Sequence, residues 1–125
     1  MGGDMLFFVA VSSLLLHEMD AIDKKEWRLL FVLRRLPDDG ALRWFILLHL
    51  PLFVALMALV AAAESTTVRW IEGGVDAFLI VHAGLHERLG SRGETAFANI
   101  FSRSLIWSAA GLGALHIVYL ILSAQ

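Results

Sequence analysis

Four long apolar segments constrain the fold of this chain more than any other feature. They cover residues 5–22, 41–63, 68–89 and 103–122. A helix that crosses a bilayer needs about 20 predominantly apolar residues, and all four segments approach or exceed this length. The chain is 58 % hydrophobic with a mean hydropathy of +0.72, whereas soluble domains contain about 45–50 % apolar residues. We therefore expect residues 1–125 to form a single transmembrane domain, an all-α bundle of four membrane-spanning helices.

The segment 23–36 has a different pattern. Its sequence, DKKEWRLLFVLRRL, mixes Trp27, Phe31 and several leucines with five basic residues. An apolar face opposite a basic face is typical of a helix that lies on a membrane surface. The sequence therefore predicts an additional amphipathic interfacial helix over 23–36, which a turn at 37–40 ends.

The basic residues are distributed unequally between the two ends of the spans. The segment 24–43 contains six of the ten Lys and Arg residues and 88–103 contains three, whereas the loop at the opposite end contains only Arg69. Cytoplasmic loops of membrane proteins are rich in Lys and Arg. We therefore predict that both basic segments are cytoplasmic and that the N- and C-termini lie outside. The membrane is expected to be a cytoplasmic (inner) membrane.

Ionisable side chains lie within the apolar segments, where they are energetically costly and commonly mark a functional site. The sequence FLIVHAGLHERLG places His82 and His86 four residues apart, on one face of a helix. At a rise of about 1.5 Å per residue, His17, His49 and His82 all lie about 8–10 Å from the cytoplasmic ends of their spans. Three helices therefore present a histidine at nearly the same depth, which predicts a shared site.

Carboxylates accompany these histidines. Asp20 follows His17 by three residues and shares its helix face, whereas Glu18 is rotated by about 100°, so Asp20 is the better candidate ligand. Asp76 and His116 lie deeper, about 20 Å in, and form either part of the site or a structural hydrogen bond between helices. The candidate metal ligands are His17, Asp20, His49, His82, His86 and His116, and the candidate catalytic carboxylates are Glu18, Asp76 and Glu87.

Five histidines with carboxylates, in a chain without cysteine, favour a borderline or hard divalent metal. We expect Zn²⁺ or Fe²⁺, with Mn²⁺ as a further option, held between the helices of the bundle. A metal ion in a membrane acts as a Lewis acid or activates water or O₂. This predicts a metalloenzyme, either a hydrolase or an oxidoreductase, that acts on a lipophilic small-molecule substrate.

Other functions fit the same residues. Two histidines on facing helices can ligate haem in an electron-transfer protein, although carboxylates are unusual neighbours for a haem. A proton or metal-ion pathway would need no catalysis, and a small membrane subunit would use its histidine cluster to bind a partner. A homo-oligomer is a further option for the assembly. The net charge of −2 gives no indication of nucleic-acid binding, so the expected partners are the lipid bilayer and a lipophilic molecule.

Two further patterns concern helix packing. The tripeptide Leu-His-Glu occurs at 16–18 and again at 85–87, and each copy precedes a later span that contains a histidine. This suggests a tandem hairpin pseudo-repeat. The small residues of 109–114 allow close approach of helices in lipid, so we expect Gly111 and Gly113 to face another helix.

A family resemblance rests on the segments HEMDAIDKKEWRLL, FILLHLPLF, VHAGLHERLG and AGLGALHIVY. They resemble a group of small bacterial four-helix membrane proteins of unknown function, akin to families named for an intramembrane H-x-x-E-E motif. In this chain the motif corresponds to His17-Glu18-Met19-Asp20, and it departs from the pattern because Asp20 and Ala21 stand in place of the two Glu. The resemblance implies a shared intramembrane site and no particular reaction.

Overall fold

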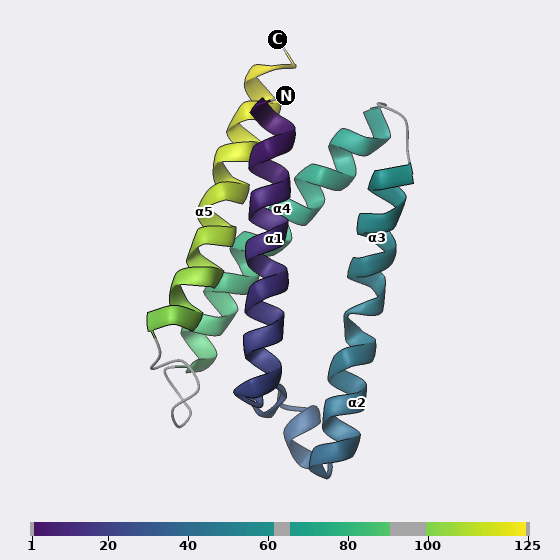
Figure 1. Cartoon of the computed structure of the whole chain (residues 1–125), viewed down its shortest axis with the longest axis vertical. Helices are drawn as coiled ribbons and strands as arrows, with labels where there is room; N and C mark the ends of the chain where they lie inside the picture. Colours follow the sequence, from purple (N-terminus) through teal and green to yellow (C-terminus); the bar gives the residue numbers. More distant parts are fainter. Residues whose placement is uncertain (1, 62–65, 91–99, 125) are drawn as a thin grey trace.

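The computed structural model describes residues 2–61, 66–90 and 100–124, and within these ranges all regular secondary structure is helical. The elements are α1 (Gly2–Asp23), the short 3₁₀ helices η1 (Glu26–Leu29) and η2 (Leu33–Arg35), α2 (Asp38–Leu48), α3 (Leu50–Ala61), α4 (Thr66–Gly90) and α5 (Ile100–Leu122) (Figure 1). The expected all-α class is confirmed. Residues 62–63, the end of the expected second span, lie outside the described residues.

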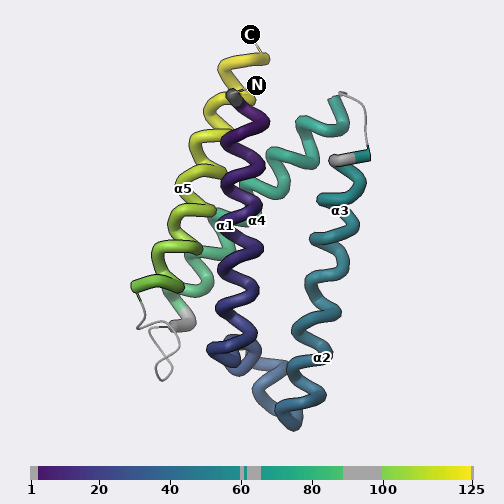
Figure 2. The backbone as a smooth tube through the Cα atoms, viewed as in Figure 1, coloured from purple at the N-terminus to yellow at the C-terminus, as the bar shows by residue number. Residues whose placement is uncertain are grey.

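The helices α2 and α3 form one apolar rod that is interrupted at His49. Pro51 has no backbone N–H, so the carbonyl of Leu47 loses its helical hydrogen-bond partner. At the break, the backbone N–H of His49 donates to the carbonyl of Ile46 at 3.1 Å. The chain continues in the same general direction (Figure 2), so Asp38–Leu59 is still a single candidate span of 22 residues.

Three helical segments of the described chain are long and apolar enough to cross a membrane, which indicates a membrane protein. They are Gly3–Asp23, Asp38–Leu59 and Ile100–Leu122. The helix α4 has 25 residues, which is sufficient length, but it carries Arg69, Glu72 and Asp76 in its first half and Glu87 and Arg88 near its end.

The packing is tightest around α5, which lies along both α1 and α4. Ala10 and Leu14 of α1 form a buried cluster with Leu79 of α4 and Ala109 of α5. The alanines bring the helix backbones close together, as is common where helices pack in lipid. The two termini lie at one end of the structure, and the connector between α1 and α2 lies at the opposite end (Figure 1).

The expected interfacial helix over 23–36 is wrong in this structure. Lys25 adopts a left-handed backbone conformation with φ 54°, which breaks helical continuity after α1. Two single-turn 3₁₀ helices follow, and Glu26, Trp27 and Leu33 point inward and are buried. The burial of this segment against Ala41 and Phe45 of α2 outweighs the amphipathic pattern that favoured a surface helix.

The expected turn at 37–40 is also corrected, because α2 begins at Asp38, three residues before the predicted start at 41. Asp38 and Asp39 occupy its first turn, where the positive end of the helix dipole stabilises carboxylates. Asp38 also pairs with Lys25, at 3.3 Å, and with Arg28. These ion pairs link the start of α2 to the segment between α1 and α2.

The two glycines of α5 differ in their surroundings. Gly113 is buried, and a Cβ atom at this position would lie 3.4 Å from the backbone oxygen of Asp76 and 3.3 Å from Leu79 Cδ1. Gly113 therefore faces α4, as predicted. Gly111 is exposed with no other atom near its missing side chain, so the expectation that it faces a helix is wrong. The two residues are about 200° apart around the helix axis, so they cannot share one narrow contact.

Candidate metal centre

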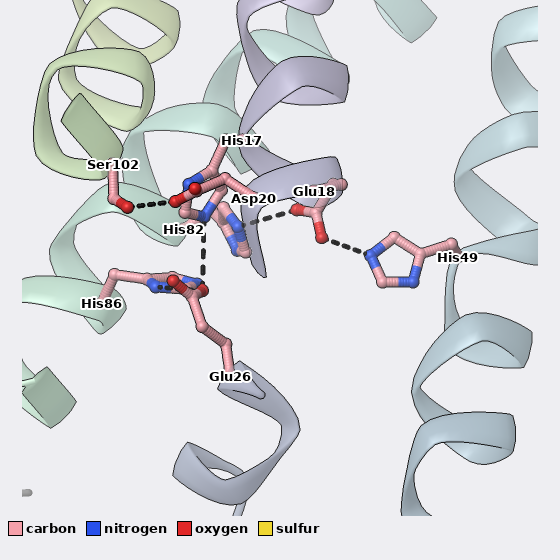
Figure 3. A network of polar contacts seen from close by, with 8 residues as sticks. All are labelled: His17, Glu18, Asp20, Glu26, His49, His82, His86 and Ser102. Atoms are coloured by element: carbon pink, nitrogen blue, oxygen red, sulfur yellow. Dashed lines mark hydrogen bonds and ion pairs between the residues drawn. The ribbon is translucent and has the colours of Figure 1, made fainter. Parts of the chain in front are cut away.

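Three of the predicted histidines converge at one point. His17 comes from the last turns of α1, and His82 and His86 come from successive turns of α4 (Figure 3). Each offers one ring nitrogen, and these three atoms lie within 4.8 Å of one another. The ring centroids of His17 and His86 are 4.9 Å apart, and those of His82 and His86 are 4.4 Å apart. Two nitrogens bound to one metal ion are at most about 4 Å apart, because metal–nitrogen bonds are about 2 Å long, so the three rings are close to the spacing that one ion requires.

A fourth group at this point, Glu26, was missed by the sequence analysis. Its Oε2 lies 3.6 Å from His17 Nε2 and 3.4 Å from His86 Nδ1. The residue is only 2 % exposed, and within the described part of the chain neither carboxylate oxygen has a hydrogen-bond partner. Burial, together with the negative charges of Glu18 and Asp20, raises the pKa of Glu26 to about 8. A cation bound between Glu26 and the histidines would offset the free-energy cost of burying the ionised carboxylate.

The position of Glu26 follows from the local chain path. After α1 ends, the left-handed conformation of Lys25 turns the backbone. The helix η1 therefore places Glu26 next to the end of α1, beside His17. The sequence contained one signal: Glu26 is an acidic residue nine positions after His17 in an otherwise basic segment. On an interfacial helix this carboxylate would have faced water, so the wrong secondary structure concealed it.

Glu18 links a fourth histidine, His49, to the group. Its Oε2 lies 2.7 Å from His49 Nε2, and its Oε1 lies 3.3 Å from His82 Nε2 (Figure 3). The other ring nitrogen of His49, Nδ1, donates to the carbonyl oxygen of Phe45 at 2.7 Å. His49 therefore stands one carboxylate away from the three-histidine group, on the opposite side of Glu18.

A cavity of about 510 Å³ adjoins these groups. It is bounded by α1, η1, the α2–α3 rod and α4. Its polar wall consists of Glu18, Glu26, His49, His82 and His86, and its remaining lining is apolar: Leu29, Leu30, Phe45, Leu48, Pro51, Leu52, Phe78 and Leu85. The cavity is therefore lined mainly by apolar residues, with the histidines and the two carboxylates together on its polar wall.

The remaining predicted site residues have other partners. Asp20 accepts a hydrogen bond from Ser102, which joins α1 to α5. Asp76 pairs with His116 through Oδ2 and Nδ1 at 2.7 Å, fully buried between α4 and α5. Glu87 accepts hydrogen bonds from Arg103 at 2.9 Å and from Trp107 at 3.4 Å on an exposed face. Within the described residues, the structure brings none of these carboxylates, nor His116, into the three-histidine group.

Comparison of the sequence with known protein families finds one match. Residues 4–123 match the profile of a family of unknown function, DUF6713. The chain belongs to this family. The match covers α1 and α4, which carry the three converging histidines, the connector with Glu26 and the α2–α3 rod, so the DUF6713 profile spans the whole candidate centre. No curated protein and no solved structure matches the chain.

Proposed function

We propose that this DUF6713 protein is a membrane-embedded metalloprotein that binds a divalent metal through His17, His82, His86 and Glu26. One observation carries the proposal: three histidine nitrogens within 4.8 Å of one another, with a buried carboxylate oxygen 3.4–3.6 Å from two of them. Three imidazoles and a carboxylate suit Zn²⁺ or Fe²⁺, and Mn²⁺ is a weaker option because it prefers more oxygen ligands.

The surroundings support an enzyme that acts on a lipophilic small molecule. The 510 Å³ cavity has apolar walls on three elements and meets the polar group at one side, which suits a molecule with an apolar body and a reactive polar end. A metal at this wall would polarise such a group or activate water. Glu18 lines the same wall and lies 3.3 Å from Nε2 of His82.

A second cavity supports the lipophilic character of the substrate. It has a volume of about 240 Å³ and lies between α1 and the α2–α3 rod. It shares Glu18, Phe45 and His49 with the larger cavity. Its other lining residues are apolar. Two of them are exposed at the surface, Met19 at 70 % and Ile46 at 50 %. In a bilayer this groove would face lipid acyl chains.

We propose further that α4 is a fourth membrane span, which completes a four-helix membrane bundle with the basic segments in the cytoplasm. The polar residues of α4 that point inward have partners: Asp76 pairs with His116, and His82 contacts Glu18. Ile80 and Val81 of α4 are exposed and do not line the cavity, so they suit contact with lipid. Reporter fusions after Ala61 and after Gly90 must then report opposite compartments, and the same compartment for both would refute this topology.

Elemental analysis of the detergent-purified chain tests the metal proposal. We expect about one Zn, Fe or Mn per chain. The variants His17→Ala, His82→Ala, His86→Ala and Glu26→Gln should lose most of it. The matched control is His116→Asn, which removes a buried imidazole outside the group and leaves an amide able to bond Asp76, so it should retain the metal. A strong Soret band without non-haem metal would identify a haem protein instead. Full metal content in all four variants would make the cluster structural, as in a membrane subunit or a proton pathway.

A further inference from the structure

Both ring nitrogens of His49 have partners within the protein. The break at Pro51 turns the backbone N–H of His49 to the carbonyl of Ile46, which leaves the carbonyl of Phe45 to accept from the His49 side chain. A carbonyl only accepts hydrogen bonds, so Nδ1 of His49 carries a hydrogen. The ring orientation of His49 is thereby set. Its Nε2 lies 2.7 Å from Glu18 Oε2, a hydrogen bond that requires a hydrogen on one of these two atoms. No nitrogen of His49 is left to ligate a metal.

Glu18 uses its two oxygens in opposite directions. Oε2 binds His49 and Oε1 lies 3.3 Å from Nε2 of His82, and the carboxylate is nearly buried, at 8 % exposed. Histidines that ligate metals commonly donate their second ring N–H to a carboxylate, which orients the ring and makes it a better ligand. Because Nε2 of His82 lies against Glu18, a metal shared with His17 and His86 would have to bind His82 through Nδ1.

From this geometry, and resting on the proposed metal site, we infer that Glu18 and His49 are positioning residues outside the coordination sphere. Glu18 orients His82 towards the metal, and His49, anchored to the backbone of α2, holds Glu18 in place. The inference assigns His49 a role different from the ligand role that its depth in the sequence suggested. It also connects the helix break at Pro51 to the metal site, because that break frees the carbonyl that anchors His49.

The probe for this inference is Co²⁺ added to the full-length, metal-stripped protein in detergent. The visible absorption bands of bound Co²⁺ report its ligand set, and titration reports its affinity. We expect Glu18→Gln and His49→Ala to bind one Co²⁺ with unchanged band positions and with affinity lowered about 10–100-fold, the usual effect of removing an orienting partner. His49→Gln keeps a donor for Glu18 and should recover part of the affinity. His82→Ala, which removes a ligand, should shift the bands or abolish binding. The exposed carboxylate of Asp39 provides the matched control, and Asp39→Asn should behave as wild type.

Each other outcome has a definite meaning. If His49→Ala and His49→Gln shift the bands as His82→Ala does, His49 is a ligand and the inference is overturned. If Glu18→Gln shifts the bands, Glu18 binds the metal directly, and the inference fails in that part. Unchanged affinity in both Glu18→Gln and His49→Ala shows that neither residue positions His82. Failure of the wild-type protein to bind Co²⁺, Zn²⁺ or Fe²⁺ refutes the proposed function itself, a result distinct from all of these.

Discussion

Replacement of Gly113 by leucine should disrupt the contact between α4 and α5. A Cβ atom alone at this position would lie 3.3 Å from Leu79 Cδ1 and 3.4 Å from both the backbone oxygen and Oδ1 of Asp76. The end of the Leu79 side chain can shift by a few tenths of an ångström, so Gly113→Ala should be tolerated. The three further carbons of leucine would meet the backbone of α4 at Asp76, which has no such freedom.

The cost of Gly113→Leu has two components. Overpacking a tight contact costs about 1–3 kcal/mol. Separation of α4 from α5 would also break the buried hydrogen bond between Asp76 and His116, and a buried polar group without its partner costs about 1–3 kcal/mol or more. Both components together are a large part of the 5–15 kcal/mol that typically stabilises a folded domain.

Unfolding in mild detergent, followed by circular dichroism at increasing temperature or denaturant, measures this effect. The matched control is Gly111→Leu, two residues away on the exposed side of α5, where nothing lies within 4 Å of the added Cβ. Gly111→Leu should change the free energy of unfolding by about 0.5 kcal/mol or less, whereas Gly113→Leu should lower it by several times that amount. Equal stability of the two variants would refute the α4–α5 packing described above.

Three other predictions follow from individual contacts. Metal should remain bound above about pH 7 and be released as the pH falls towards about 5, because protons compete for imidazoles whose ordinary pKa is about 6.5; metal content that does not change over this range would exclude histidine ligation. Lys25→Gly should raise the free energy of unfolding by up to about 1 kcal/mol, since Lys25 has a left-handed φ of 54° that glycine adopts without strain. A marked loss of stability in denaturant would show instead that the ion pair of Lys25 with Asp38 contributes more than the backbone strain costs. Glu87→Gln should leave metal content unchanged and alter stability by about 0.5 kcal/mol at most, because its pairing with Arg103 is exposed; loss of metal would place Glu87 in the site.

The sequence alone determined the helical class and much of the histidine arrangement. Apolar segments of about 20 residues have few alternatives to helices, and the observed ends of α1, α4 and α5 lie within about three residues of those expected. The spacing of His82 and His86 requires one helix face, and equal depth correctly brought His17 near them, with ring centroids of His17 and His82 5.7 Å apart. These results depend only on helix periodicity and rise, which are local properties.

The tertiary structure decided which carboxylates join the histidines. Periodicity favoured Asp20 over Glu18, but α1 has neighbours on several sides, so Asp20 meets Ser102 of α5 while Glu18, rotated away from it, meets His49 and His82. Glu26 reaches the group only because Lys25 adopts a left-handed conformation, and a single backbone reversal has no periodic signature in the sequence. Contacts of this kind depend on the directions in which separate segments pack, and those directions are set by the burial of the whole chain.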